Sequence, residues 1–138
     1  MSYLLATNIV SEARRPNGNA NVKAWLASVS AVSLYLSVLV IGEIRRGIEH
    51  LRRRDPVQAA VYESWLATLV RDYAGHILPV TAEIAEEWGR MNAPDPVPTI
   101  DGLMAATAHV HGLTFVTRNT ADVARAGVRL LNPFEPVR

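Results

Sequence analysis

The chain alternates short apolar runs with longer segments in which apolar residues recur every three or four positions. Short runs predict buried strands, and the 3.6-residue spacing predicts helices with one face in the core. Strands are expected at residues 3–5, 33–37, 76–80, 113–117 and 128–131. Because helices separate them, right-handed crossovers and a mainly parallel sheet covered on both faces are expected, which is an α/β, doubly wound fold.

Capping residues predict where the helices begin. Thr7 and Asn8 supply cap chemistry for the first helix, and Asn19 or Asn21 for the second. A long helix is expected from Val38 to the arginines at 52–54. The later helices are expected to begin at Asp55-Pro56, at Thr81, at Thr99 after the proline-rich loop 94–98, and at Asn119 or Thr120. The helix after Asp55 is expected to bury a stripe made of Val61, Trp65, Leu69 and Tyr73.

Composition places the chain among single globular domains. It has 138 residues, 49% of them apolar and 20% charged, and no Gly/Ser linker divides it, so one domain over 1–138 is expected. The absence of cysteine excludes disulfides, thiolate metal sites and a cysteine nucleophile. No apolar run reaches the ~18 residues of a membrane span and no signal peptide is evident, so we expect a cytoplasmic protein. With a net charge of +1, affinity for nucleic acid must come from local clustering.

Three acids follow predicted strands. Glu43 lies a turn or so after the second strand, Asp101 lies in the first turn of the helix after the proline-rich loop, and Asp122 follows the fourth strand. Ligands of such sheets bind outside the carboxyl ends of the strands, so these carboxylates could converge on one site. The alternative is that Asp101 and Asp122 only favour helix N-termini and that Glu43 pairs with Arg46 at the surface.

Other kinds of site find less support. No Gly-rich phosphate loop follows a strand, and no Gly-x-Ser-x-Gly turn is present. His109 and His111 are two positions apart, so on one helix they point in different directions and make a poor metal pair. Trp25, Trp65 and Trp88 are interpreted as core residues.

Four segments favour a shared site for the three acids over separate roles at helix ends: YLLATNIVSE at 3–12, SVLVIGEIRRG at 37–47, DGLMAATA at 101–108 and TRNTAD at 117–122. In this order and spacing they resemble the PIN-domain ribonuclease toxins, and in particular the VapC family with its FitB-like branch. The resemblance covers essentially the whole chain. It implies an α/β/α sandwich with a mainly parallel central sheet. It also implies cleavage of RNA that depends on Mg²⁺ or Mn²⁺, by acids that follow separate strands.

Three of the family's acidic positions are occupied here, by Glu43, Asp101 and Asp122. Where the family has Leu-Leu-Asp-Thr-Asn, this chain has Leu-Leu-Ala-Thr-Asn, so Ala6 stands at the position of a metal-binding aspartate. Since Mg²⁺ prefers carboxylate and water oxygens, we expect weak metal binding and little or no cleavage. Two histories fit this alanine, a deliberate inactivation, which we favour, or a natural chain that kept only binding.

Several further residues are candidates around the acids. Four of them could orient ligands or contact phosphates, or could serve only as helix caps: Thr7, Asn8, Thr117 and Asn119. Arg118 is a further candidate for contact with RNA. Candidates for a basic rim along RNA are Arg14, Arg15, Arg45, Arg46 and Arg118. The arginines at 52–54 are expected instead to suit the dipole of the helix that they end.

The resemblance further implies a homodimer, an RNA substrate and a VapB-type antitoxin whose tail occludes the acidic pocket, often with a basic side chain. An alternative function is a non-catalytic PIN-fold module that binds an antitoxin or RNA through the same surface.

Overall fold

The computed structural model describes residues 1–93, 96–124 and 127–136, so the first two residues of the predicted proline-rich loop lie outside the described residues. The described strands form one five-stranded sheet in the order β3-β2-β1-β4-β5, with every pair parallel. The strands are β1 (Tyr3–Leu5), β2 (Leu34–Ser37), β3 (Ile77–Leu78), β4 (Thr114–Val116) and β5 (Leu130–Leu131). The predicted parallel sheet is confirmed, with each strand at its expected place.

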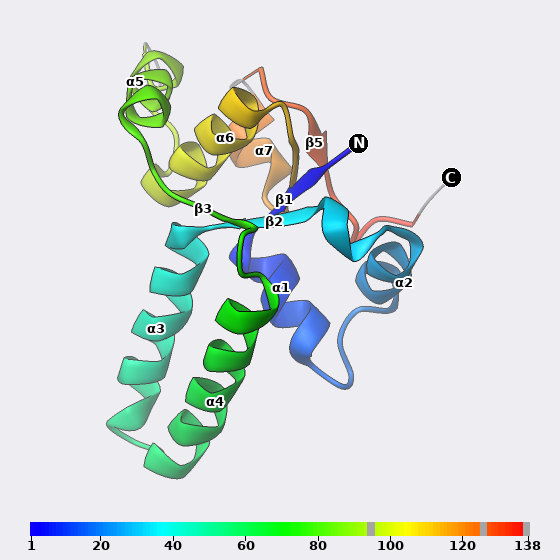
Figure 1. Cartoon of the computed structure of the whole chain (residues 1–138), viewed down its shortest axis with the longest axis vertical. Helices are drawn as coiled ribbons and strands as arrows, with labels where there is room; N and C mark the ends of the chain where they lie inside the picture. The colour runs from blue at the N-terminus through cyan, green and yellow to red at the C-terminus, as the bar shows by residue number, and fades with distance from the viewer. Residues whose placement is uncertain (94–95, 125–126, 137–138) are drawn as a thin grey trace.

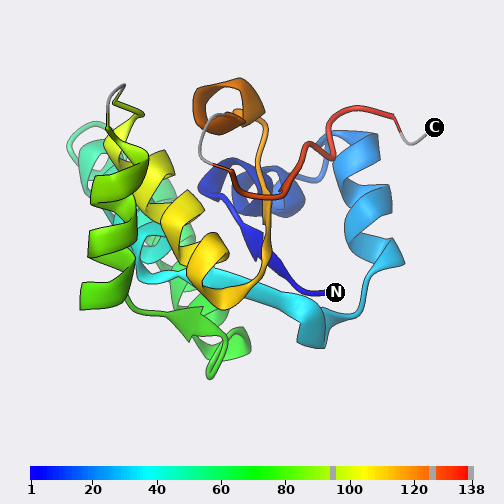
Figure 2. The ribbon, with the colours of Figure 1, turned by 90° about the horizontal axis from the view of Figure 1, so that it is seen from above.

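Helices cover both faces of this sheet. The chain steps from β1 to β2 to β3 in one direction and then from β4 to β5 in the other, so right-handed crossovers put α1 to α4 and α5 to α7 on opposite faces. Figure 1 shows α1, α3 and α4 below the sheet with α5 and α6 above it, and Figure 2 shows α5 and α6 side by side. The helices are α1 (Thr7–Arg14), α2 (Ala20–Ser28), the 3-10 turn η1 (Ala31–Ser33), α3 (Val38–Arg52), α4 (Pro56–Asp72), α5 (Ala82–Met91), α6 (Thr99–His111) and α7 (Thr120–Val123).

Several predicted helix starts are confirmed by their caps. The side chains of Asn19, Asp55 and Thr81 accept backbone N–H hydrogen bonds at the starts of α2, α4 and α5. The prediction for α1 is wrong, because the N-cap residue is Ala6, which has no side chain that can cap. Thr7 is therefore the first residue inside the helix, and its hydroxyl is free for another partner.

The predicted stripe of α4 is partly wrong. The side chain of Val61 is 49% exposed, whereas Ala59, Leu66 and Leu69 are buried. The helix is rotated from the expected position because α3 packs against it, and Figure 1 shows the two helices as a hairpin.

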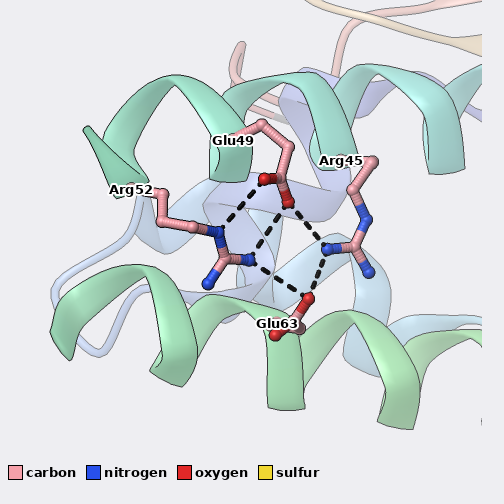
Figure 3. A network of polar contacts seen from close by, with 4 residues as sticks. All are labelled: Arg45, Glu49, Arg52 and Glu63. Atoms are coloured by element: carbon pink, nitrogen blue, oxygen red, sulfur yellow. Dashed lines mark hydrogen bonds and ion pairs between the residues drawn. The ribbon is translucent and has the colours of Figure 1, made fainter. Parts of the chain in front are cut away.

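Four charged side chains, exposed or half-buried, link the two helices of this hairpin (Figure 3). Arg45 of α3 pairs with Glu49 and with Glu63 of α4, and Arg52 pairs with the same two carboxylates at 3.1 and 3.2 Å. Hydrogen bonds from the guanidinium groups lower the pKa of Glu49 and of Glu63, with Arg52 the larger cause for Glu49 and Arg45 for Glu63. Salt screens such exposed pairs, so they set the register of the hairpin more than its stability.

No helix among the described residues is both long and apolar enough to cross a membrane.

Gly102 of α6 provides a test of the packing between α5 and α6. A Cβ at this position would lie 2.6 Å from Cγ2 of Val97 and 3.2 Å from the indole of Trp88. Because a buried methyl group that does not fit forces its neighbours to move, Gly102→Ala should cost roughly 1 to 3 kcal/mol of unfolding free energy. Urea denaturation measures this change.

The control for this prediction is Gly89→Ala in α5, where a Cβ would meet no atom within 4 Å. It should stabilise the protein by up to about 1 kcal/mol through helix propensity. An equal gain at Gly102 would contradict the close packing.

Candidate active site

A cleft lies where the carboxyl ends of β1 and β4 meet, which is also where the strand order reverses. It encloses about 290 Å³. Residues that follow β1, together with residues of α3, α6 and the β4–α7 turn, line it: Ala6, Thr7, Asn8, Ser11, Glu43, Asp101, Met104 and Asn119. Six of these are residues that the sequence singled out, so the pairing of distant strands brings most of the predicted site together.

Ala6 joins β1 to α1 at the base of the cleft. Its backbone N–H donates a hydrogen bond to the carbonyl of Val116 in β4 at 2.9 Å, which continues the ladder one residue beyond β1. The residue is 1% exposed and is also the N-cap of α1. A side chain at position 6 therefore lies both at the cleft and at the positive end of a helix dipole.

Glu43 enters the cleft from α3. Its Oε1 accepts a hydrogen bond from the hydroxyl of Thr7 in α1. In the part of the chain that the structure describes, no ion pair joins Glu43 to Arg46, so the predicted surface pair is absent. The Thr7 contact holds the carboxylate toward β1 and gives Thr7 a role other than capping.

Asp101 lies in the first turn of α6 and faces the same cleft. Partial burial raises the pKa of its carboxyl above the ordinary value, and the negative charges of Glu43 and then of Asp122 raise it further. A hydrogen bond with the side chain of Asn119 opposes this rise. Glu43 and Asp122 come from distant parts of the sequence, and both lie close enough for their charges to disfavour ionised Asp101.

Asp122 is placed differently from the other two acids. It lies in the first turn of α7, is exposed, and is not among the residues that line the cleft. Across residues 1–93, 96–124 and 127–136, no three acidic, histidine or cysteine side chains gather closely enough to hold an ion. The cleft itself thus has two carboxylates, with Asp122 acting on Asp101 from its edge.

Asn8 and Thr117 connect the segments that follow β1 and β4. The Asn8 side chain donates to Thr117 Oγ1 at 3.5 Å and accepts from the backbone N–H of Arg118 at 3.2 Å. Thr117 is fully buried, and its hydroxyl also accepts from the N–H of Asn119 at 3.1 Å. These bonds hold the turn that places Asn119 beside Asp101.

The predicted rim arginines are divided among several partners. The guanidinium of Arg14 lies 4.0 Å from the ring centre of Tyr62, and that of Arg118 lies 4.6 Å from the ring centre of Phe134. Arg15 pairs with Glu12, and Arg45 is held in the α3–α4 network. Arg46 has no ion-pair partner within the described ranges.

Two residues of the cleft, Ser11 and Met104, were not among the candidates. Ser11 lies four residues after Thr7 and Met104 three after Asp101, so each lies one helical turn from a predicted site residue. Helical spacing from the known candidates is the signal that would have found them.

The donor set of the cleft fits a hard divalent cation. Glu43 and Asp101 offer carboxylate oxygens, and the amide of Asn119 and the hydroxyl of Thr7 lie beside them. Protein sites for Mg²⁺ commonly use one or two carboxylates and leave the other positions to water and phosphate oxygens. Glu43 and Asp101 together match the number of carboxylates that such a site uses.

An all-parallel sheet with an acidic cleft at the reversal of strand order defines an α/β protein with its ligand site at the carboxyl edge. Residues 3–128 match the PIN domain family. The chain belongs to this family.

Its relatives are bacterial. It is 32% identical to Toxin FitB of Neisseria gonorrhoeae over 95% of this chain and 97% of the relative. It is 30% identical to VapC ribonuclease Y4jK of Sinorhizobium fredii over 96% and 98% of the two chains. A solved structure of FitAB bound to a DNA fragment matches with a TM-score of 0.90 and 30% identity, covering 99% of this chain and 98% of that one. The resemblance and the α/β/α sandwich predicted from the sequence are confirmed.

The raised pKa of Asp101 predicts how stability depends on pH. A folded-state pKa above the unfolded value means that folding favours the neutral carboxyl, so this contribution is complete below pH of about 4 and is lost as pH rises through the folded pKa. Asp101→Asn should therefore stabilise the metal-free protein at neutral pH, by less than about 1 kcal/mol because the site is half exposed, and should do so less in acid. Melting curves across pH measure this.

The same substitution in a Glu43→Gln background is the matched control. Removing Glu43's charge takes away one cause of the shift, so the gain from Asp101→Asn should be smaller there. An identical gain in both backgrounds would show that the two carboxylates do not interact.

Proposed function

We propose that this chain, as one PIN domain over 1–138, is the toxin of a type II toxin-antitoxin system and has the fold of a divalent-metal-dependent endoribonuclease. The observation that carries the proposal is the convergence of Glu43 and Asp101 on one cleft at the carboxyl edge of the sheet. Relatives that align over nearly the whole chain are named as a toxin and as a ribonuclease, which supports it.

Asp101 would be the main direct ligand of Mg²⁺ or Mn²⁺, with Glu43 and Asp122 acting directly or through water. The chemistry that such an ion supplies when bound is polarisation of a phosphoryl oxygen and activation of a water for in-line attack. Within the chain, Thr7 orients Glu43 and Asn119 orients Asp101. Asn8, Thr117 and Arg118 hold the turn from which Asn119 projects.

Ala6 makes this chain a weak or inactive form of the enzyme. The position lies at the cleft between the end of β1 and the start of α1, where an aspartate would add a third carboxylate. Without it, fewer negative oxygens offset the cost of stripping water from the ion, so we propose weak metal binding and little or no cleavage.

A second candidate function is a non-catalytic module that binds an antitoxin or RNA. The observation in its favour is that the described residues contain no cluster of three metal-binding side chains. The similarity of this chain to FitAB, whose structure was solved bound to a DNA fragment, supports an antitoxin partner of the VapB type for this chain. A basic antitoxin side chain would be attracted to the carboxylates of Glu43 and Asp101. A homodimer, an RNA substrate and a cytoplasmic location complete the proposal.

Restoring the carboxylate tests the nuclease. Ala6→Asp should cleave RNA with Mg²⁺ or Mn²⁺ and not with EDTA, because the cleft regains the oxygen that the ion needs. The parent should be at least about a hundredfold slower, the scale on which lost metal-site groups act. Gel analysis of labelled RNA measures the rate.

The control is Ala6→Asn, which has the same shape without the charge and should remain as slow as the parent. If Ala6→Asp behaves like Ala6→Asn, the binding-only function is favoured.

Thermal stability separates metal binding from helix capping. Both Asp and Asn at position 6 can cap α1, so each should stabilise the metal-free protein by up to about 1 kcal/mol, less any repulsion that the Asp meets from Glu43 and Asp101. Only Ala6→Asp should then gain a large further increase in melting temperature as Mg²⁺ is added. Equal Mg²⁺ gains for parent, Asp and Asn forms would contradict a metal role for position 6.

A further inference from the structure

Three neighbouring hollows form one groove along α3. The acidic cleft shares Thr7, Ser11 and Glu43 with a second hollow of about 260 Å³ between α1, α3 and α4. This second hollow shares Gly47 and Leu51 with a third, which lies over the C-terminal half of α3. From Glu43 to the end of α3 is about 14 Å at 1.5 Å per residue. The groove therefore leads from the candidate metal site to the other end of the helix.

Five arginines fall between positions 45 and 54, and the structure divides them into two groups. Arg45 and Arg52 face α4, where Glu49 and Glu63 neutralise them (Figure 3). The remaining three are exposed and form no ion pair within the described ranges: Arg46, Arg53 and Arg54. One face of α3 thus keeps its positive charge.

Arg46, His50 and Arg54 line the third hollow together. Arg46 and His50 lie one helical turn apart on α3, and Arg54 lies two residues beyond the end of the helix, so the three follow one another along the third hollow. All three side chains are exposed. We call these three residues the basic row.

Gly47 lies beside the basic row and belongs to both the second and the third hollow. Glycine inside a helix costs about 1 kcal/mol relative to alanine. A Cβ at Gly47 would meet no atom within 4 Å, so the packing of the protein does not require a glycine here. What the missing side chain leaves is bare helix backbone at the floor of the groove, open to a ligand that must approach closely.

We propose that the basic row binds the phosphate backbone of the RNA strand that enters the acidic cleft, and that Gly47 lets this strand lie against α3. The proposal rests on the proposed function, in which RNA is the substrate. The exposed guanidinium groups of Arg46 and Arg54, which form no ion pair in the described part of the chain, are suited to contact successive parts of a phosphate backbone. Leu51 is the one large apolar side chain that lines the third hollow, so we expect this hollow to recognise RNA mainly through charge.

Binding of RNA in EDTA tests the row without requiring cleavage. The probe is a short fluorescein-labelled single-stranded RNA of mixed sequence, and fluorescence anisotropy gives its Kd at several salt concentrations. Arg46→Gln combined with Arg54→Gln should raise the Kd about tenfold and reduce the slope of log K against log salt by about 1.4, or about 0.7 for each lost contact.

The matched control is Arg45→Gln combined with Arg52→Gln, which removes the same charge from the same helix. Because Glu49 and Glu63 already neutralise these two arginines, the slope should stay that of the parent. Equal losses in the two double variants would mean that RNA senses only net charge and would overturn the proposal. So would an unchanged slope in the first, or a parent that does not bind the probe at low salt.

Gly47→Gln gives an independent readout. A helix-favouring side chain in open space should raise the melting temperature, and the same side chain should weaken RNA binding because it fills the floor of the groove. Gly89→Gln, in the open on α5, should raise the melting temperature and leave RNA binding unchanged. If Gly47→Gln leaves RNA binding intact and instead shifts the elution volume on size exclusion, the face joins two copies of this chain and the proposal is overturned.

These results are distinguishable from those for the nuclease. If Ala6→Asp cleaves RNA and the Arg46 and Arg54 substitutions leave RNA binding unchanged, the proposal about the basic row is overturned and the proposed nuclease stands. If the basic row binds RNA and Ala6→Asp does not cleave it, the basic row stands and the proposed nuclease is overturned.

Discussion

The hydrogen-bonded pairing of β1 with β4 is the constraint on which the site depends. These strands are more than a hundred residues apart in sequence, and their parallel register continues through the bond from the Ala6 N–H to Val116. Because both strands run the same way, the residues that follow them meet at one edge of the sheet. β2, on the other side of β1, aims α3 so that Glu43 reaches the same edge. If β1 were displaced, the segment that follows it, with Ala6 and Thr7, would no longer line one cleft with Glu43 and Asn119.

Repulsion among the carboxylates works against that arrangement. Burial and two neighbouring negative charges make ionised Asp101 unfavourable, and a hydrogen bond with the Asn119 side chain offsets part of the cost. The three acids stay near one another in spite of this repulsion because each belongs to a different helix, and the packing of that helix fixes its position. On the proposed function, an aspartate at position 6 would add a further negative charge to this group, and Ala6 leaves that charge out.

The sequence was sufficient to predict what depends on local pattern. The strands, the parallel sheet and most helix starts follow from periodicity and capping residues. The grouping of Glu43 with Asp101 was left open by that pattern and was favoured only by the resemblance to the PIN-domain toxins. Properties set by packing between elements could not be predicted. The rotation of α4 that exposes Val61 depends on how α3 lies against it, and the place of Asp122 outside the cleft depends on how α7 packs. The pairing of Arg45 with Glu63 likewise depends on the register of two helices, which no single-helix pattern contains.

Position 6 also has an evolutionary consequence. As the N-cap of α1 it favours an acidic or amide residue, so folding itself does not oppose the return of an aspartate. An alanine codon that ends in a pyrimidine differs from an aspartate codon by a single base. If the alanine is natural, then on the proposed function a cell that carries the gene would be one point mutation from an active toxin, and a co-expressed inhibitor would be needed to make such a reversion survivable.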